Sequence, residues 1–388
     1  MATVLKSATT PDEIAACVRQ RFEIYTEEMN LYRDSADHSD RSLSDPFDAW
    51  GRFFCAEVDG AVVAGVRQHW GFDGIEKAGL ARAFPDDWHD IYDFTSFTEV
   101  PLAQMAVGSK LTVNADFRGG PVPTSLMFFS IQEAIKAGIT LVFLDCVPHL
   151  INFYARLGWR QYTDNIADSA VGILVPMCLV LHDVAHLERL KSPLLPVVLQ
   201  VLPDAKAPAW VDQRFPHASY AQAGHQAPEH ADVFKLLSQE RMAIFQGFEP
   251  EQVSTLMAGS NVLDCEPNAL FIRRRTVYRS VFVVLGGSMQ VRTERADGSQ
   301  QVLSELLPGE LVGEVSFVLG GMRSADVFAG AQGARVLALQ ENALRKVLGG
   351  DPAIAAKFYQ NLARILALRL SNTVGAGNQT AATIGATA

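Results

Sequence analysis

The chain has 388 residues, of which 48% are hydrophobic and 20% charged, and its formal net charge is −10 at pH 7. This length predicts two domains with a core each, and this composition excludes an intrinsically disordered chain. No uninterrupted apolar run reaches the ~18 residues of a membrane span and no basic-then-apolar leader opens the chain, so we expect a cytoplasmic protein without a transmembrane segment.

The charge is unevenly distributed. Residues 1–195 hold 16 Lys and Arg against 26 Asp and Glu, whereas residues 196–388 hold 17 of each. Neither half is basic, so we expect no nucleic-acid partner. The acidic half favours an amine-bearing ligand, with solubility as the alternative reason for the charge. The five cysteines lie at least 32 residues apart without a C-x-x-C pair, which predicts reduced thiols and no metal site.

In the first half, helical and strand patterns alternate. Apolar residues recur at helical spacing over residues 12–28, and residues 53–66 are typical of a β-hairpin that turns at Asp59-Gly60. The elements that follow are a strand, a helix, a strand buried on both faces, a short helix and a closing strand, at residues 105–113, 124–137, 139–147, 150–157 and 171–181. The pattern predicts an α+β domain over residues 1–195, with a mixed sheet and flanking helices.

The segment NFYARLGW at residues 152–159 follows the buried strand. This segment and the order of the elements resemble the GNAT acyltransferase fold. The resemblance implies that Tyr154 donates a proton to the departing thiolate; a core tyrosine is the alternative. It also implies that the acyl donor is held by the strand-to-helix turn, at Arg118, Gly119 and Gly120.

The donor turn departs from the GNAT pattern at two positions. Pro121 and Pro123 stand where the family has glycines, and proline has no N–H to donate to a diphosphate. We therefore expect coenzyme A to bind poorly. Acyl carrier protein, whose pantetheine arm carries only a phosphodiester, becomes a candidate donor and partner beside acyl-CoA.

The N-terminal segment resembles two GNAT-like families that use such donors, the autoinducer synthases and the N-acyl amino acid synthases. The similar segments are RFEIYTEE at 21–28, DPFD at 45–48 and GVR at 65–67, and VPHL at 147–150 with VPM at 175–177 favours the N-acyl amino acid branch. Lys110 stands where the autoinducer branch carries arginine, which argues against a lactone-forming enzyme.

These segments supply the candidate residues for a small-molecule amine substrate such as an amino acid. The aspartates would hold the ammonium, and Arg21 would fix the loop or pair with a substrate carboxylate; loop capping is the alternative for the aspartates. The amine-binding candidates are Arg21, Asp45, Asp48 and Arg67. The candidate bases, acting directly or through water, are Glu99, Asp145 and His149, with a structural histidine as the alternative at position 149.

The middle of the chain is rich in proline and has no sustained period, so we predict a linker at residues 196–231, with one short strand at 195–202. A second domain is expected at residues 232–372, ending in a helix at 351–370. The residues from 373 to 388 are small and polar, which predicts a disordered tail. No helix-turn-helix pattern follows the second domain, so we do not expect a transcription factor.

The second domain contains GELVGEVSFVLGGMRSADV at residues 309–327, a pattern typical of an anion cradle. Gly313 permits a tight turn before a helical start with free N–H groups, and Arg323 adds a guanidinium nine residues after Glu314. The segment resembles the phosphate-binding cassette of cyclic nucleotide-binding domains. The strand–glycine–strand segment of that family is similar to SVFVVLGGSMQV at residues 280–291.

The resemblance implies a β-roll with C-terminal helices that binds a cyclic nucleotide, cAMP or cGMP, as an effector. The glycine and the glutamate would contact the ribose and the phosphate edge, and the arginine would contact the cyclic phosphate. The implied nucleotide-binding residues are Gly313, Glu314, Arg323, Ser324 and Ala325. A ligand-free roll that keeps its glycines for turns alone is the alternative.

Three functions agree with these patterns. The favoured one is an enzyme, an N-acyltransferase that moves an acyl group from acyl carrier protein or acyl-CoA to a small amine under cyclic-nucleotide control. The alternatives are a cyclic-nucleotide-controlled protein lysine acetyltransferase that uses acetyl-CoA, and a non-catalytic cyclic nucleotide sensor. The acyl length, the acceptor amine, the sign of the regulation and the oligomeric state stay open.

Overall fold

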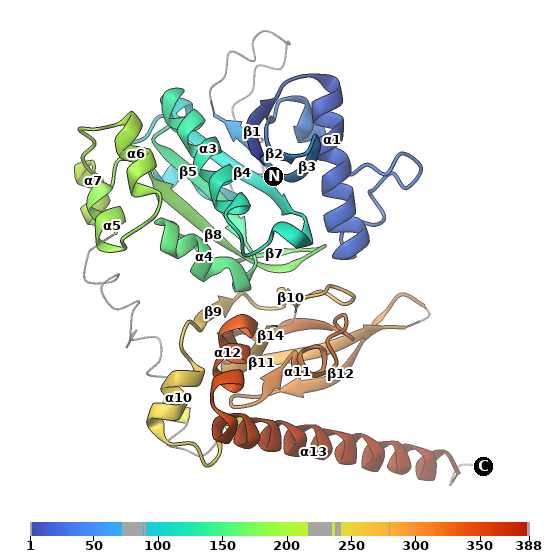
Figure 1. The fold of residues 1–388 in the computed structure, drawn as a ribbon. Coiled ribbons are helices and arrows are strands. Elements are labelled where there is room, and N and C mark those ends of the chain that lie inside the picture. The colour runs from blue at the N-terminus through green and yellow to red at the C-terminus, as the bar shows by residue number, and fades with distance from the viewer. Residues whose placement is uncertain are drawn as a thin grey trace. The chain divides into compact units, whose positions relative to one another are not determined.

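The computed structural model describes residues 2–71, 88, 91–215, 235–236, 242–278, 280–295 and 297–385, with the backbone alone for 372–385. The chain divides into two compact units (Figure 1). Unit 1 comprises Met1–Ala221 with Arg275–Val277, and unit 2 comprises Gln222–Arg274 with Tyr278–Ala388. The five cysteines are free and buried. In the part of the chain described, no helix combines the length and apolar character needed to cross a membrane.

Unit 1 is built on a sheet with the strand order β1-β2-β3-β4-β5-β8. The strands are β1 (Thr3–Ala8), β2 (Arg52–Val58), β3 (Ala61–Trp70), β4 (Met105–Val113), β5 (Leu141–Cys146) and β8 (Gly172–Val180), with β6 (Arg160–Gln161) and β7 (Ile166–Asp168) paired to β8. All neighbours are antiparallel except β4 and β5, which are parallel. The expected α+β class with a mixed sheet is confirmed. Asp59 and Gly60, at φ +52° and +82°, form the predicted hairpin turn between β2 and β3.

The helices of unit 1 begin and end where local chemistry permits. Helix α1 (Pro11–Arg21) starts at a capping box between Thr10 and Glu13, and a π-helix (Phe22–Glu28) continues it. Helix α3 (Val122–Lys136) packs on β1, β2 and β3 and buries Leu126 there. Helix α4 (Ile151–Leu157) ends at Gly158, whose φ of +113° terminates the helix.

The linker predicted at residues 196–231 is wrong for its first part, which is helical and belongs to unit 1. Residues after 183 form α5 (Val184–Arg189), α6 (Leu195–Val201) and α7 (Ala209–Arg214), and all three belong to unit 1. Pro196 lies in the first turn of α6, where a missing N–H costs nothing, and Pro208 directly precedes α7. These two prolines therefore mark helix starts. Val198 and Val211 are fully buried. The strand predicted at 195–202 is therefore a helix, and residues 216–231 lie outside the described residues.

Unit 2 is a β-roll, as expected. The strands are β9 (Asn261–Cys265), β10 (Leu270–Ile272), β11 (Val281–Glu294), β12 (Gln300–Leu306), β13 (Leu311–Val312) and β14 (Asp326–Leu339). Strand β14 pairs with β9, β10 and β11, and β11 also pairs with β12 and β13, all antiparallel. Gly287 is required where β11 crosses β14, because a Cβ there would lie 2.2 Å from the Gly333 carbonyl oxygen.

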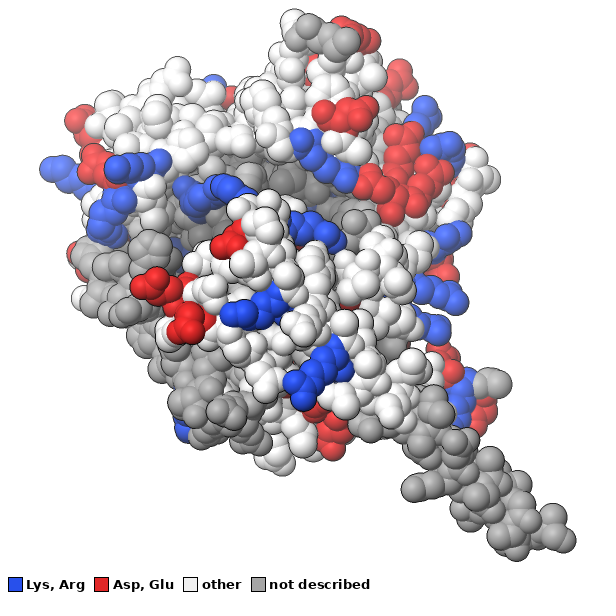
Figure 2. All heavy atoms as spheres, turned by 60° about the horizontal axis from the view of Figure 1, so that its bottom comes forward, with Lys and Arg blue, Asp and Glu red and all other residues white. Residues whose placement is uncertain are grey.

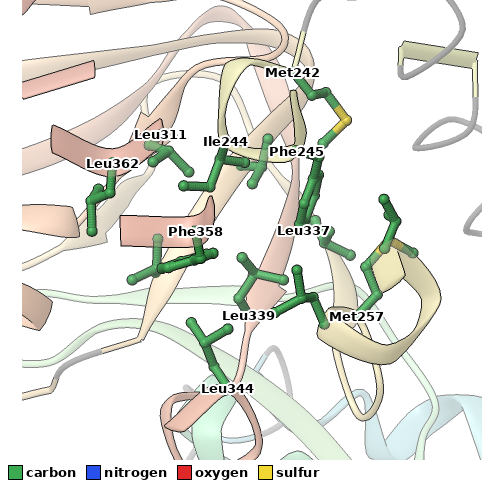
Figure 3. Close-up of a cluster of buried hydrophobic side chains, with 14 of the residues drawn as sticks. Met242, Ile244, Phe245, Met257, Leu311, Leu337, Leu339, Leu344, Phe358 and Leu362 are labelled. Atoms are coloured by element: carbon green, nitrogen blue, oxygen red, sulfur yellow. The ribbon is translucent and has the colours of Figure 1, made fainter. Parts of the chain in front are cut away.

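Helices close one side of the roll. They are α10 (Pro250–Leu256), α11 (Glu314–Leu319), α12 (Glu341–Gly350) and α13 (Pro352–Gly385). Phe358 and Leu362 of α13 belong to one buried cluster with Ile244, Leu337 and Leu339 (Figure 3). The predicted disordered tail is wrong for residues 373–385, which continue α13. Once this core has fixed the first turns of the helix, each added residue gains a backbone hydrogen bond.

Candidate functional site

Strands β4 and β5 separate in the middle of the unit 1 sheet. They pair only over Met105–Val107 and Leu141–Phe143, and both strands continue beyond this pairing. Strands that part inside a sheet leave backbone polar groups that need other partners. The Leu111 carbonyl of β4 accepts a hydrogen bond of 3.1 Å from the Tyr25 hydroxyl of the π-helix. A side chain of the π-helix thus satisfies a backbone group of β4 beyond the point where the strands separate.

Asp145 lies on β5 beyond the point of separation. Its carboxylate accepts a hydrogen bond of 2.5 Å from the Tyr92 hydroxyl. Burial raises the pKa of the Asp145 carboxyl above its usual range, although the Tyr92 hydroxyl and the charge of Lys110 act in the opposite direction. A carboxylate with a raised pKa is a stronger base, suited to accepting a proton from an ammonium group.

Tyr154 lies on α4 and is buried beside Trp159, with ring centroids 5.9 Å apart. Burial raises the pKa of its phenol well above 10, and the neighbouring Cys146, Tyr25 and Asp145 add to the shift. The side chain is therefore a neutral phenol at neutral pH. It can donate a proton during a reaction, but it regains one rather than staying a phenolate. Both the proton-donor role and the core-tyrosine alternative agree with this environment.

The four amine-binding candidates form one network. Arg21 Nη1 donates to both oxygens of Asp48, at 3.0 and 2.9 Å, and to the Leu43 carbonyl. Arg67 Nη1 donates to Asp45 Oδ1 and to Asp48 Oδ1, both at 2.5 Å. Both arginines are almost fully buried. Arg21 therefore fixes the loop. Because Asp48 and the Leu43 carbonyl occupy its guanidinium, Arg21 does not pair with a substrate carboxylate in this arrangement.

The two aspartates also cap the short 3-10 helix Pro46–Ala49, as the capping alternative predicts. Asp45 accepts from the Phe47 N–H, and Asp48 accepts from the Asp45 N–H. Asp48 is saturated by these bonds, whereas the Asp45 side chain is 27% exposed. Burial favours a higher pKa for Asp45, but the hydrogen bond and charge of Arg67 hold it below the usual range. Asp45 is thus the aspartate of this pair that could meet an ammonium.

Other predicted residues lie elsewhere or are engaged. Glu99 and His149 are exposed, His149 in the turn Pro148–Leu150. The Arg118 guanidinium forms a two-pronged ion pair with Glu28 and donates to the Val113 carbonyl. It therefore orders the turn and is engaged by the Glu28 carboxylate, the position that a donor phosphate would need.

The rest of the donor turn has the expected backbone. Gly119 has φ +75°, and α3 starts directly after Pro121 with Pro123 in its first turn. The backbone N–H groups that proline lacks are therefore missing at the start of α3, as the sequence predicts.

Sequence reasoning missed Tyr25 and Tyr92. Tyr25 fits the apolar period of residues 12–28, which is typical of a core position, but its hydroxyl donates to the Leu111 carbonyl of β4. Burial raises the pKa of the Tyr25 phenol to about 12. Tyr92 lies in a stretch without periodicity, and it meets Asp145 across 53 residues. No local signal marks that pairing.

The nucleotide cassette of unit 2 is centred on Arg323. Its Nη1 donates to the Gly313 carbonyl at 2.9 Å and to Ser316 Oγ at 2.7 Å, and its Nη2 donates to the Ser280 carbonyl at 2.6 Å. Gly313 has φ +84°, and a Cβ there would lie 2.2 Å from Arg323 Nη1. The glycine thus serves both the turn and the approach of the guanidinium.

In the described part of the chain, the hydrogen bonds of Arg323 reach no carboxylate. The side chain is 5% exposed, all its acceptors are neutral, and its Nε finds no acceptor among the described residues. Burial lowers the pKa of its guanidinium to about 10, despite the charges of Glu314 and Glu341. A buried cation without a counter-charge is costly, and a bound anion would relieve that cost.

Glu314 stands beside this arginine at the start of α11. It is buried, and its Oε1 accepts a hydrogen bond from Arg369 of α13. Ser324 is exposed and Ala325 is half-buried. The structure therefore brings Gly313, Glu314 and Arg323 into one cradle, with Ser324 and Ala325 at its outer side.

Among the described residues, the face of the molecule drawn in Figure 2 carries no broad basic area of the kind that binds nucleic acid. Figure 2 shows basic and acidic side chains interspersed there, without a broad basic area in the part drawn in colour or white. The expected absence of a nucleic-acid partner stays a prediction.

Comparisons with known proteins agree with the cassette. Residues 262–351 match the family described as "Cyclic nucleotide-binding domain". A CRP-like cAMP-activated global transcriptional regulator of Mycobacterium tuberculosis is 26% identical over 139 residues, which are 34% of this chain and 57% of the regulator. The chain thus spans little more than half the length of this relative. Unit 2 contains a cyclic nucleotide-binding domain.

Solved structures similar to the chain include two of different kinds. A cyclic nucleotide-binding domain from Methylobacillus flagellatus is 21% identical, with a TM-score of 0.33, covering 37% of this chain and 81% of that one. Escherichia coli ElaA is 17% identical, with a TM-score of 0.32, covering 46% of this chain and 99% of that one.

Proposed function

We propose that this protein is an N-acyltransferase that moves an acyl group from acyl carrier protein or acyl-CoA to a small amine, under the control of a cyclic nucleotide bound to unit 2. The observation that carries the catalytic part is Asp145, a carboxyl of raised pKa held by Tyr92 where β4 and β5 separate. The effector part is supported by the domain match and by the buried guanidinium of Arg323, whose Nε finds no acceptor among the described residues.

In the proposed reaction, the Asp45 carboxylate attracts the acceptor's ammonium group and Asp145 accepts one proton from it. The neutral amine then attacks the thioester carbonyl carbon, and a C–N bond forms while the carbonyl oxygen takes the electron pair. When the tetrahedral intermediate collapses, the C–S bond breaks. Tyr154 donates its hydroxyl proton to the departing thiolate. The nitrogen of the new amide then gives up a proton, which restores the Tyr154 hydroxyl. The products are an amide and a free thiol, and the proton on Asp145 returns to water.

In unit 2, we propose that Arg323 binds the cyclic phosphate and that Glu314 accepts from a ribose hydroxyl. The Nε–H of Arg323 supplies a donor with no other acceptor among the described residues. The Ser324 hydroxyl would add a donor at the outer side, next to Ala325. The nucleotide changes the transfer rate through its different affinity for two arrangements of the chain.

The test is a transfer assay on the purified full chain, with acyl carrier protein and CoA thioesters of several lengths presented in parallel to a mixture of amino acids. Mass spectrometry identifies the products with cAMP, with cGMP and without nucleotide. We expect N-acyl amino acids whose amount changes with one nucleotide. Acylation of protein lysines from acetyl-CoA would instead support the acetyltransferase alternative. Nucleotide binding by calorimetry without any transfer would support the sensor alternative.

A further inference from the structure

Lys110 occupies an irregular position in β4. Its φ is +56°, a left-handed conformation that a lysine rarely adopts. The pairing of β4 with β3 shifts there, because Arg67 stands opposite Ser109 whereas Gly65 stands opposite Thr112. Two residues of β4 thus face one residue of β3, which is a β-bulge, a device that redirects a side chain next to a site. The bulge follows closely after the residues where β4 leaves β5.

The ammonium of Lys110 stands apart from the ion pairs of this region. The two arginines and two aspartates nearby are matched against one another, as described above. Lys110 forms no ion pair with any carboxylate in the described ranges. Its Nζ lies 4.3 Å from the ring centroid of Tyr32 and 5.8 Å from that of Tyr25, so neutral aromatic faces are its neighbours. Burial lowers the pKa of this lysine, which an anionic ligand would reverse.

Two acids share the surroundings of Lys110. Asp45 accepts a hydrogen bond from Arg67, which stands opposite Ser109 beside the lysine, and Asp145 lies on β5 beyond the residues where β4 leaves it. The charges of both acids favour the protonated form of Lys110, against the charges of Arg67 and Arg21. A small molecule with an ammonium and a carboxylate on adjacent atoms has matching charges. Its ammonium would meet an aspartate and its carboxylate the lysine.

We infer that Lys110 binds the carboxylate of the acceptor and selects an amino acid over a simple amine. The inference rests on the proposed function and deepens it, because it names the part of the acceptor that the site recognises. It also replaces Arg21 with Lys110 as the partner of the substrate carboxylate. Asp48 already occupies Arg21, whereas Lys110 forms no ion pair in the described ranges.

The experiment compares an amino acid with the amine left after its decarboxylation, for wild type and for three variants. Lys110→Met removes the charge at similar length, Lys110→Gly removes it while easing the left-handed backbone, and Lys110→Arg keeps it. We expect the Met and Gly variants to raise the KM for the amino acid at least about tenfold, as for loss of a charge-assisted hydrogen bond. Their KM for the decarboxylated amine should change little, and the Arg variant should retain most of the preference. Lys136→Met, on the surface of α3, is the matched control that should leave both substrates unaffected.

Calorimetry of the amino acid without any acyl donor separates this inference from the proposed function. Amino acid binding that Lys110→Met abolishes, in a protein that transfers nothing, would uphold the subsite and reject the transferase. Equal use of both substrates by the wild type would overturn the subsite. So would equal losses for both substrates in the Met and Gly variants, because these would mark a structural role for the bulge.

Discussion

Arg369 of α13 donates a hydrogen bond to the carboxylate of Glu314, and its second terminal nitrogen donates to the Leu311 carbonyl at 2.6 Å. Glu314 is the group that we propose to accept from a ribose hydroxyl. The last helix of unit 2 and the nucleotide therefore share one buried carboxylate. A ligand that donates a hydrogen bond to Glu314 therefore weakens its bond with Arg369, and so changes the free energy of packing α13 on the roll.

Removing this arginine should loosen α13 and favour the nucleotide. In Arg369→Ala the buried Glu314 loses its counter-charge, so we expect a lower Tm without ligand and a larger stabilisation by the nucleotide than in wild type. Thermal unfolding with and without saturating cAMP or cGMP measures both. Arg364→Ala is the matched control on the same helix, because Arg364 is exposed and, among the described residues, its side chain donates to Gln246 and to no carboxylate. A nucleotide-induced shift no larger than that of wild type would mean that Arg369 does not compete for Glu314.

Substitution of Gly313 should abolish nucleotide binding through Arg323. An added Cβ would lie 2.2 Å from Arg323 Nη1, so Gly313→Ala displaces the guanidinium as well as straining the turn. We expect at least a tenfold loss of affinity by calorimetry, the loss of about one charge-assisted hydrogen bond. Gly320→Ala is the control, since Gly320 has φ +71° but its Cβ would meet nothing within 4 Å. It should cost about 1–2 kcal/mol of stability with affinity intact. Similar affinity losses in both variants would point to the backbone rather than to Arg323.

Asp145→Asn should lose activity without losing the fold. An amide can still accept from Tyr92, but it cannot take a proton, so we expect transfer to fall about 10²–10⁴-fold. The folded state binds the Asp145 proton more tightly than the unfolded state, because the folded pKa is raised. The contribution of this group to stability is thus greatest at low pH and is lost as the pH rises from the ordinary pKa through the raised one. At neutral pH the Asn variant should match or exceed wild type in free energy of unfolding, and a marked loss in urea titration would assign Asp145 a structural role.

Tyr92→Phe should shift the pH profile of transfer upward. The base must be unprotonated, so kcat/KM of wild type rises with pH through the raised pKa of Asp145. The Tyr92 hydroxyl holds that pKa down, and its removal should move the rising limb to higher pH. Tyr162→Phe, which breaks a 2.7 Å bond to the Tyr92 carbonyl, is the control and should leave the limb in place. An unshifted limb in the Tyr92 variant would remove Asp145 as the titrating base.

Changing Pro121 and Pro123 to Gly should improve binding of coenzyme A thioesters. The double change restores two N–H groups where α3 begins, and we expect affinity for acyl-CoA to rise at least about tenfold while use of acyl carrier protein changes less. Isothermal titration with acyl-CoA provides the measurement. Pro196→Gly, at the start of α6, controls for the loss of proline rigidity. Tight acyl-CoA binding by the wild type would contradict the argument for a carrier-protein donor.

Features that depend on neighbouring residues could be predicted from the amino-acid sequence. The apolar run at 139–147 predicted β5, the Asp59-Gly60 dipeptide predicted the first hairpin, and the glycines around 309–327 predicted the cassette turn. Each follows from a side-chain period or from backbone freedom, which are set within a few residues. The same local rules misread residues 195–214, because a proline that ends one helix and a proline that starts another look alike in isolation.

Which polar groups bind each other depends on how the chain packs. Arg21 and Asp48 lie 27 residues apart, Tyr92 and Asp145 lie 53 apart, and Glu314 and Arg369 lie 55 apart. A buried charge must find a partner wherever the packing of the sheet and helices brings one, and no local pattern encodes that partner. The sequence could therefore nominate Arg21 and Asp48 for a site. Packing alone determined that they bind each other, and that Lys110 and Arg323 form no ion pair with a carboxylate of the described residues.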